Sequence, residues 1–300
     1  MRAMSALPQL TPRQLWTPLA LTLVWGLNWP IMKFGVSGFP PLSFRALSMW
    51  LGLPVLAGIL WWRRVPFRIP RADWPELLQL TVLNMLFWHT LAILAIASLS
   101  SGRAAILGYT MPVFSALLGA WWFGQGLSRR ASGGVLAGVC LLLWHELTQL
   151  SGKPIGVLMM LVAAFTWAWG TQRMRRTTLQ APNLAIAFWM TLITAVWMSV
   201  WSWVNEAPQW HTPSPAVWAA IVYNALGVFA FAQVVWLGIA RDLPPVASTL
   251  SVMFTPVIGV FSRALWLGEV LYWQDWTAAT LIALTIATVL CPVRDSLSTH

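Results

Sequence analysis

Polar side chains interrupt the long apolar stretches of this sequence at a few places, and these residues are the first candidates for chemistry. His89 and Gln233 are separated by 144 positions (89 + 144 = 233); His89 lies near the middle of one apolar run, and Gln233 lies within another. Asn28 and Gln172 have the same separation (28 + 144 = 172). When such a run crosses a membrane as a helix, a polar side chain at its middle faces a cavity or bonds to a neighbouring helix. The pairs therefore indicate either a binding site built from two equivalent parts or hydrogen bonds between helices.

Aromatic side chains form the second group of candidates. Trp25 and Trp169 are again 144 positions apart, while Trp88 and Trp236 lie close in sequence to His89 and Gln233. Indoles at these positions could wall a binding site, although most of the 23 Trp are expected in belts at the membrane–water interfaces. Two tyrosines and an asparagine could hydrogen-bond the charged groups of a ligand. The predicted binding residues are His89, Gln233, Trp25, Asn28, Trp169, Gln172, Tyr109, Tyr223, Asn224, Trp88 and Trp236.

Motifs for catalysis or cofactor binding are absent from the sequence. It contains no CxxC, HExxH, glycine-rich phosphate loop or GxSxG, so we predict no enzyme, no metal and no cofactor. None of the eight Asp and Glu lies in the middle of an apolar run, which leaves His89 as the one group there that could exchange a proton near neutral pH. We expect His89 to be neutral, because burial disfavours the imidazolium; proton coupling is the alternative.

Long apolar segments must position these residues. The chain of 300 residues is 58% hydrophobic and 9% charged, whereas soluble domains carry about 25% charged residues. The sequence therefore predicts an all-α integral membrane protein in a lipid bilayer. Its basic residues lie between apolar runs and form no patch, which excludes nucleic acid as a partner. The ten expected transmembrane helices, numbered one to ten, are 16–35, 42–62, 77–99, 103–123, 131–148, 155–172, 184–204, 215–238, 244–267 and 276–292.

Lys and Arg predict the orientation, because positive residues are retained in the cytoplasm. Three basic residues lie on the side of the membrane opposite the N-terminus, namely Lys33, Arg103 and Lys153. Arg45 and Arg263 lie inside spans near that same side. Both termini are therefore predicted to be cytoplasmic. The 13 basic residues on the side of the N-terminus are Arg2, Arg13, Arg63, Arg64, Arg68, Arg71, Arg129, Arg130, Arg173, Arg175, Arg176, Arg241 and Arg294.

The offset of 144 extends over the whole chain and indicates an internal repeat. Five spans per repeat make the second copy enter the membrane from the opposite side, as in secondary transporters. We predict a first five-helix repeat at 1–150 and an inverted second repeat at 151–300. Small residues in spans five and ten, such as Gly134 and Gly138, predict helix packing and a possible homodimer. Further matches are Trp25-Gly26 with Trp169-Gly170 and Pro112-Val113 with Pro256-Val257; the two prolines are expected to kink their helices.

With this repeat, the chain resembles the EamA family of the drug/metabolite transporter superfamily. The resemblance is carried by Leu-Val-Trp-Gly-Leu-Asn ending at Asn28, by Arg45 in span two, by the repeated Pro-Val and by Gly268-Glu269. Gln125 departs from it, because the family often has Glu there. Within the family, the chain is most similar to the ten-span bacterial aromatic amino-acid exporters of the YddG type.

This resemblance implies a multi-pass transporter of the bacterial inner membrane that exports amino acids, especially aromatic and hydrophobic ones, by alternating access. Facilitated diffusion is favoured over proton coupling. Efflux of lipophilic cationic drugs is a rival function, against which the lack of a mid-span carboxylate counts. A membrane-embedded enzyme or receptor is the other rival, and it would need a nucleophile, a metal set or a large loop.

Overall fold

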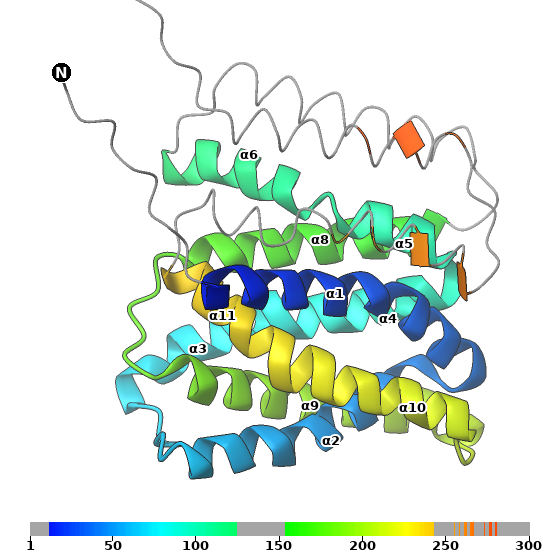
Figure 1. The fold of residues 1–300 in the computed structure, drawn as a ribbon, viewed down its shortest axis with the longest axis horizontal. Helices are drawn as coiled ribbons and strands as arrows, with labels where there is room; N and C mark the ends of the chain where they lie inside the picture. Colours follow the sequence, from blue (N-terminus) through cyan, green and yellow to red (C-terminus); the bar gives the residue numbers. More distant parts are fainter. Residues whose placement is uncertain are drawn as a thin grey trace, which may run out of the picture.

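A computed structural model describes residues 12–124 and 154–242, together with ten single positions from Thr255 to Thr280 (Figure 1). The described ranges are helical, with short connections and no strand. Seven helical segments are long and apolar enough to cross a membrane. They coincide with predicted spans one to four and six to eight, so the all-helical prediction is confirmed for this part of the chain. Spans five, nine and ten, at 131–148, 244–267 and 276–292, lie wholly or largely outside the described residues.

Three of the seven segments are built from more than one helical piece. Span three joins η1, α3, the π-helix η2 and α4; span four joins α5 and α6; span eight joins α10, the π-helix η4 and α11. The bounds are α1 Pro12–Gly38, α2 Pro41–Trp62, η1 Arg71–Asp73, α3 Trp74–Thr81, η2 Val82–Phe87, α4 Trp88–Ser98, α5 Ser101–Gly108, α6 Met111–Phe123, α8 Pro154–Met174, α9 Asn183–Glu206, η3 Ala207–Gln209, α10 Pro215–Tyr223, η4 Asn224–Ala232 and α11 Gln233–Asp242.

Local sequence explains where several helices begin. Ser100 and Ser214 cap α5 and α10, and each side chain accepts a hydrogen bond from the backbone N–H three residues on. Pro41 and Pro215 stand in the first turns of α2 and α10, where a missing N–H costs nothing. The starts of α2, α5 and α10 are therefore encoded by residues next to them.

The first helices of the two repeats run in opposite directions. Lys33, near the end of α1, donates to the carbonyl of Ile96 at the end of α4, over 3.0 Å. Gly156, at the start of α8, packs against Ser98 in the same place. The end of α1 and the start of α8 therefore lie at the same end of the bundle, as Figure 1 shows. An inverted second copy requires this antiparallel arrangement.

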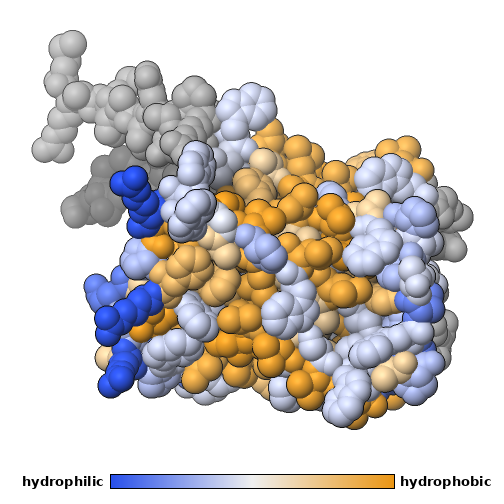
Figure 2. Space-filling model, turned by 90° about the horizontal axis from the view of Figure 1, so that it is seen from below, coloured by the Kyte–Doolittle hydropathy of each residue, from blue (hydrophilic) through white to orange (hydrophobic). Residues whose placement is uncertain are grey.

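The surface carries a hydrophobic belt between two more polar ends (Figure 2). Exposed tryptophans occur near the ends of the helices, for example Trp61 and Trp62 at the end of α2 and Trp203 near the end of α9. Most basic residues in the described ranges, including Arg63, Arg173 and Arg241, lie at the end of the bundle where α1 begins. Interfacial indoles and a one-sided basic end are what a bilayer imposes on a multi-pass protein.

Cysteine labelling tests the orientation predicted from these charges. Ser37, Gln209 and Arg68 are all exposed, so a cysteine at each position is open to a reagent. In a background without Cys140 and Cys291, we expect a membrane-impermeant maleimide on intact cells to label Ser37→Cys and Gln209→Cys. Arg68→Cys should react only after the cells are opened. The reverse pattern would overturn the orientation and the assignment of cytoplasmic termini.

Candidate binding site

Four tryptophans from four different spans meet inside the bundle. Trp167 of α8 stacks on Trp236 of α11, with ring centroids 4.8 Å apart and ring planes 28° from parallel. The ring centroid of Trp25 in α1 lies 5.5 Å from that of Trp236, and the ring centroid of Trp88 in α4 lies 6.2 Å from that of Trp167. These residues, the tryptophan cluster below, bring together spans one, three, six and eight. The structure thus places three predicted residues side by side around Trp167, which the sequence analysis did not select.

Trp169 lies apart from this cluster, although its repeat position matches that of Trp25. Its ring stacks on Trp122 of α6 at 5.7 Å, and Trp122 is 66% exposed. Residues two apart on a helix point in nearly opposite directions. Trp167 therefore points into the bundle while Trp169 points toward α6, and the repeat alone carries no information about this difference.

A second group of residues surrounds the buried ring of Phe229 in η4. His89 lies with its ring centroid 5.1 Å from that of Phe229, and the Arg45 guanidinium carbon lies 5.6 Å from the same centroid. His89 is 5% exposed, and its Nδ1 has no hydrogen-bond partner. Asn224, which is fully buried, accepts a hydrogen bond from Arg45 over 3.1 Å. Charged and polar groups are therefore concentrated beside one aromatic ring.

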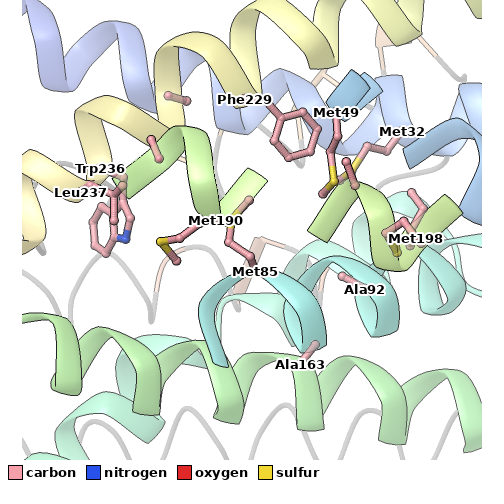
Figure 3. Packing of buried hydrophobic residues seen from close by; sticks show 14 of the residues in the cluster. Met32, Met49, Met85, Ala92, Ala163, Met190, Met198, Phe229, Trp236 and Leu237 are labelled. Carbon is pink, nitrogen blue, oxygen red and sulfur yellow. The ribbon is translucent and has the colours of Figure 1, made fainter. Parts of the chain in front are cut away.

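Methionines fill the space between the helices near this ring (Figure 3). Met32, Met49, Met85, Met190 and Met198 are all buried, and they come from α1, α2, η2 and α9. Unbranched thioether side chains repack easily around apolar groups of different shape. The core beside Phe229 is therefore built from adaptable residues.

Two π-helical segments occupy equivalent positions in the two repeats. η2 covers Val82–Phe87, and adding 144 gives 226–231, which lies within η4 at Asn224–Ala232. His89 follows η2 by two residues, and Gln233 follows η4 directly. Gln233 is 7% exposed, so the predicted pair is buried in both copies. π-Helical turns are frequent at functional sites, and here they set the rotation of the two predicted polar residues.

The predicted tyrosines have different surroundings. Tyr109, at the break between α5 and α6, accepts a hydrogen bond from the Trp29 indole over 3.4 Å. A Cβ on the adjacent Gly108 would lie 2.7 Å from the Trp29 ring, so glycine is needed for this close approach. Tyr223 instead donates to the Val24 carbonyl at 2.8 Å, which ties α10 to α1. Trp29 is a further residue that the sequence analysis did not select.

The pair of Asn28 and Gln172 is buried but not equivalent in its contacts. Asn28 is 7% exposed, and its Oδ1 has no partner. The Gln172 amide donates to the backbone and side-chain oxygens of Ser115 at 2.7 and 2.9 Å. Gln172 therefore links α8 to α6, which favours the structural interpretation of that residue, whereas the role of Asn28 in binding stays a prediction.

The predicted kink prolines and dimer helices are only partly covered by the described residues. The helix of span four is interrupted at Tyr109 and Thr110, directly before Pro112 in the first turn of α6. Pro256 and span five lie outside the described residues, and span ten, the other proposed dimer helix, lies largely outside them. Among the residues that the structure describes, no three His, Cys, Asp or Glu side chains come together as a metal site.

The sequence matches a known protein family over most of its length. The family model of the EamA-like transporters matches residues 14–144 and 154–291, which together make up most of the chain. This chain belongs to the EamA-like transporter family. The two matched segments show that it carries two copies of the family repeat. The exact division at residues 150 and 151 stays a prediction, because it lies between the described ranges.

Relatives of similar length support the membership. The uncharacterized transporter YoaV of Bacillus subtilis is 26% identical over 84% of this chain and 87% of its own length. The uncharacterized inner membrane transporter YedA of Escherichia coli K12 is 26% identical over 90% and 88%. An E. coli K12 protein named "Probable amino-acid metabolite efflux pump" is 26% identical over 88% and 90%. A crystal structure with a TM-score of 0.72 and 20% identity covers 93% of this chain and 96% of the other, which shows a shared fold.

Proposed function

We propose that this EamA-family protein exports amino acids, in particular aromatic and other hydrophobic ones, across the bacterial inner membrane. The observation that carries the proposal is the tryptophan cluster of Trp25, Trp88, Trp167 and Trp236, in a bundle that also buries the polar group of His89, Arg45 and Asn224. Indole faces suit apolar and aromatic side chains, and buried polar groups suit an amino acid's charged end. The relative named as an amino-acid metabolite efflux pump supports the same substrate class.

The mechanism we propose is alternating access between two inverted five-helix halves, ten helices in all, with both termini in the cytoplasm. The cluster residues come from spans one, three, six and eight, so both halves contribute to the candidate site. A site at the interface of inverted repeats can open to either side as one half rocks against the other. The buried methionines near Phe229 would allow side chains of several shapes to be accepted.

Efflux of lipophilic cations is the less favoured function. A cationic drug needs an anionic or purely aromatic pocket, and the fully buried charge beside Phe229 is positive. Like charges repel strongly at low dielectric, so Arg45 opposes a cation there. A membrane enzyme is also disfavoured, because the named relatives are transporters.

For energy coupling, we favour facilitated diffusion over proton coupling. Glutamine can still form hydrogen bonds at this position, so His89→Gln should preserve export. If His89 instead carried the coupling proton, the variant would lose export against a concentration gradient but would retain counterflow exchange.

Counterflow in proteoliposomes tests the proposed function. Vesicles preloaded with unlabelled L-phenylalanine, L-tryptophan or L-leucine should accelerate uptake of labelled L-phenylalanine over empty vesicles. L-lysine, L-glutamate and ethidium should not. Trp167→Ala should weaken the effect roughly fivefold, because an aromatic contact contributes about 1 kcal/mol beyond its buried area. Trp203→Ala is the matched control, since Trp203 is 67% exposed. Exchange of ethidium without exchange of any amino acid would refute the proposal.

A further inference from the structure

Arg45 is a buried cation near the start of α2. Its side chain is 2% exposed and is among the largest fully buried side chains of the described residues. Nη1 donates to Asn224 Oδ1 at 3.1 Å, and Nη2 donates to the sulfur of Met32 at 2.6 Å. Both of these acceptors are neutral, and Nε has no hydrogen-bond partner. A buried guanidinium in these surroundings is strongly disfavoured unless an anion compensates it.

None of the acidic residues in the described ranges forms an ion pair with Arg45. Glu206 accepts hydrogen bonds from the backbone of Leu42 and Ser43 in the first turn of α2. Glu76 binds Thr177 and Thr178, and Asp73 binds the backbone of Gln180, at the opposite end of the bundle. Asp242 ends α11 at that same far end. Within the described part of the chain, the protein therefore supplies no carboxylate to Arg45.

The surroundings of Arg45 hold it in place without neutralising it. Asn224 is itself fixed, because its Nδ2 donates to the Ala220 carbonyl at 3.0 Å and so turns Oδ1 toward the guanidinium. The face of Phe229 lies 5.6 Å from the guanidinium carbon, and His89 packs on the same ring. The free Nε of Arg45 and the free Nδ1 of His89 thus both lie beside Phe229. A fixed cation with open donors is suited to bind a carboxylate.

We propose that Arg45 binds the carboxylate of the transported substrate, with Asn224 as the residue that positions the guanidinium. The inference rests on the proposed function, since it assigns the charged end of an amino acid to this group. Bound substrate supplies the counter-charge that the described protein residues lack. The protein therefore distinguishes a free acid from its neutral amide at Arg45.

A purely structural role is the competing explanation. Arg45 joins α1, α2 and η4 through Met32 and Asn224, and a link between helices would account for its burial. The two roles differ in what a substitution does to selectivity. Loss of a structural link weakens the response to every ligand together, whereas loss of a carboxylate partner weakens only the response to acids.

Three probes of equal aromatic size separate these roles: L-phenylalanine, L-phenylalaninamide, which lacks the carboxylate, and 3-phenylpropionate, which lacks the amine. In the wild type we expect both acids to raise the melting temperature of the purified protein and to compete with labelled L-phenylalanine in counterflow, and the amide to do neither. Arg45→Gln should require at least about tenfold more acid for the same stabilisation, because it removes the charge-assisted hydrogen bond to the carboxylate. Arg68→Gln, at an exposed position between α2 and α3, is the control.

The outcomes are distinct. An amide as effective as the acid in the wild type, or an equal loss for all three probes in Arg45→Gln, would overturn the role of Arg45 while leaving amino-acid export standing. Stabilisation by acids that depends on Arg45, without any amino-acid counterflow, would instead overturn the proposed export and leave the carboxylate site standing. If Arg45→Gln does not fold, Arg45→Lys retains the charge without the planar fork and should show a smaller shift in the same direction.

Discussion

Replacing Gly170 by valine is expected to prevent the accumulation of folded protein. A Cβ at this position in α8 would lie 1.9 Å from Asn84 Oδ1, 2.6 Å from Asn84 Cγ and 3.0 Å from Leu83 Cβ. Asn84 is 3% exposed within η2, so its side chain has no room to move away. Overpacking of a tight interface costs about 1–3 kcal/mol per substitution, and valine adds three carbons. We expect most of the Gly170→Val protein to be aggregated or degraded, as measured by size-exclusion chromatography in detergent.

Gly58→Val is the matched control for this prediction. Gly58 also lies inside a membrane-crossing helix, but a Cβ there would have no neighbour within 4 Å. Gly170→Ala combined with Asn84→Ala should recover part of the folded protein, because the two closest atoms are removed and the contact with Leu83 remains. Equal yields of Gly170→Val and Gly58→Val would show that the close approach of α8 and η2 is unimportant.

Helix positions and the repeat could be predicted from this sequence because both follow from averaged properties. Apolar length identifies spans such as α2 and α9, and an offset of 144 relates Trp25-Gly26 to Trp169-Gly170. The close packing of Gly170 on Asn84 explains why a residue without a side chain stands at position 170. Apolar length and repetition both survive small errors in register, which is why seven spans matched the described helices.

Side-chain partners could not be predicted in the same way, because they depend on helix rotation. The repeat paired Trp25 with Trp169. In the structure, however, Trp25 packs on Trp167, with 6.5 Å between their ring centroids. A rotation of about 100° per residue makes a two-residue difference decisive. The π-helical turns of η2 and η4 add a further local rotation that periodicity does not reveal. The repeat therefore did not predict which side chains meet inside the bundle.

Charged residues near the ends of spans were also ambiguous in sequence. Arg45 stands close to the end of span two, where a long side chain can reach the interface, yet the structure buries it at 2% exposure. Glu206 stands next to the longest loop on that side and is 5% exposed. In both cases the neighbouring helix determines burial: η4 covers Arg45, and the start of α2 covers Glu206. Hydropathy along one segment contains no information about such neighbours.

Replacing Glu206 by alanine is expected to give the second large loss of stability. One carboxylate oxygen accepts from the Leu42 N–H at 2.8 Å, and the other accepts from the Ser43 N–H and hydroxyl, both at 2.7 Å. These N–H groups belong to the first turn of α2, which has no partners within its own helix. The negative charge also complements the positive end of the helix dipole. Alanine leaves these donors buried and unpaired, at about 1–3 kcal/mol each.

Thermal denaturation in detergent checks this expectation, with Asn205→Ala as the control at an exposed neighbouring position. Glu206→Gln retains one acceptor oxygen and should fall between wild type and Glu206→Ala. Because Arg45 stands on α2 only two residues after Ser43, a loosened first turn should also lower the affinity for L-phenylalanine. This loss should extend equally to 3-phenylpropionate and L-tryptophan, since Glu206 fixes the helix and contacts no substrate. A melting temperature for Glu206→Ala equal to that of Asn205→Ala would show that α2 needs no cap from α9.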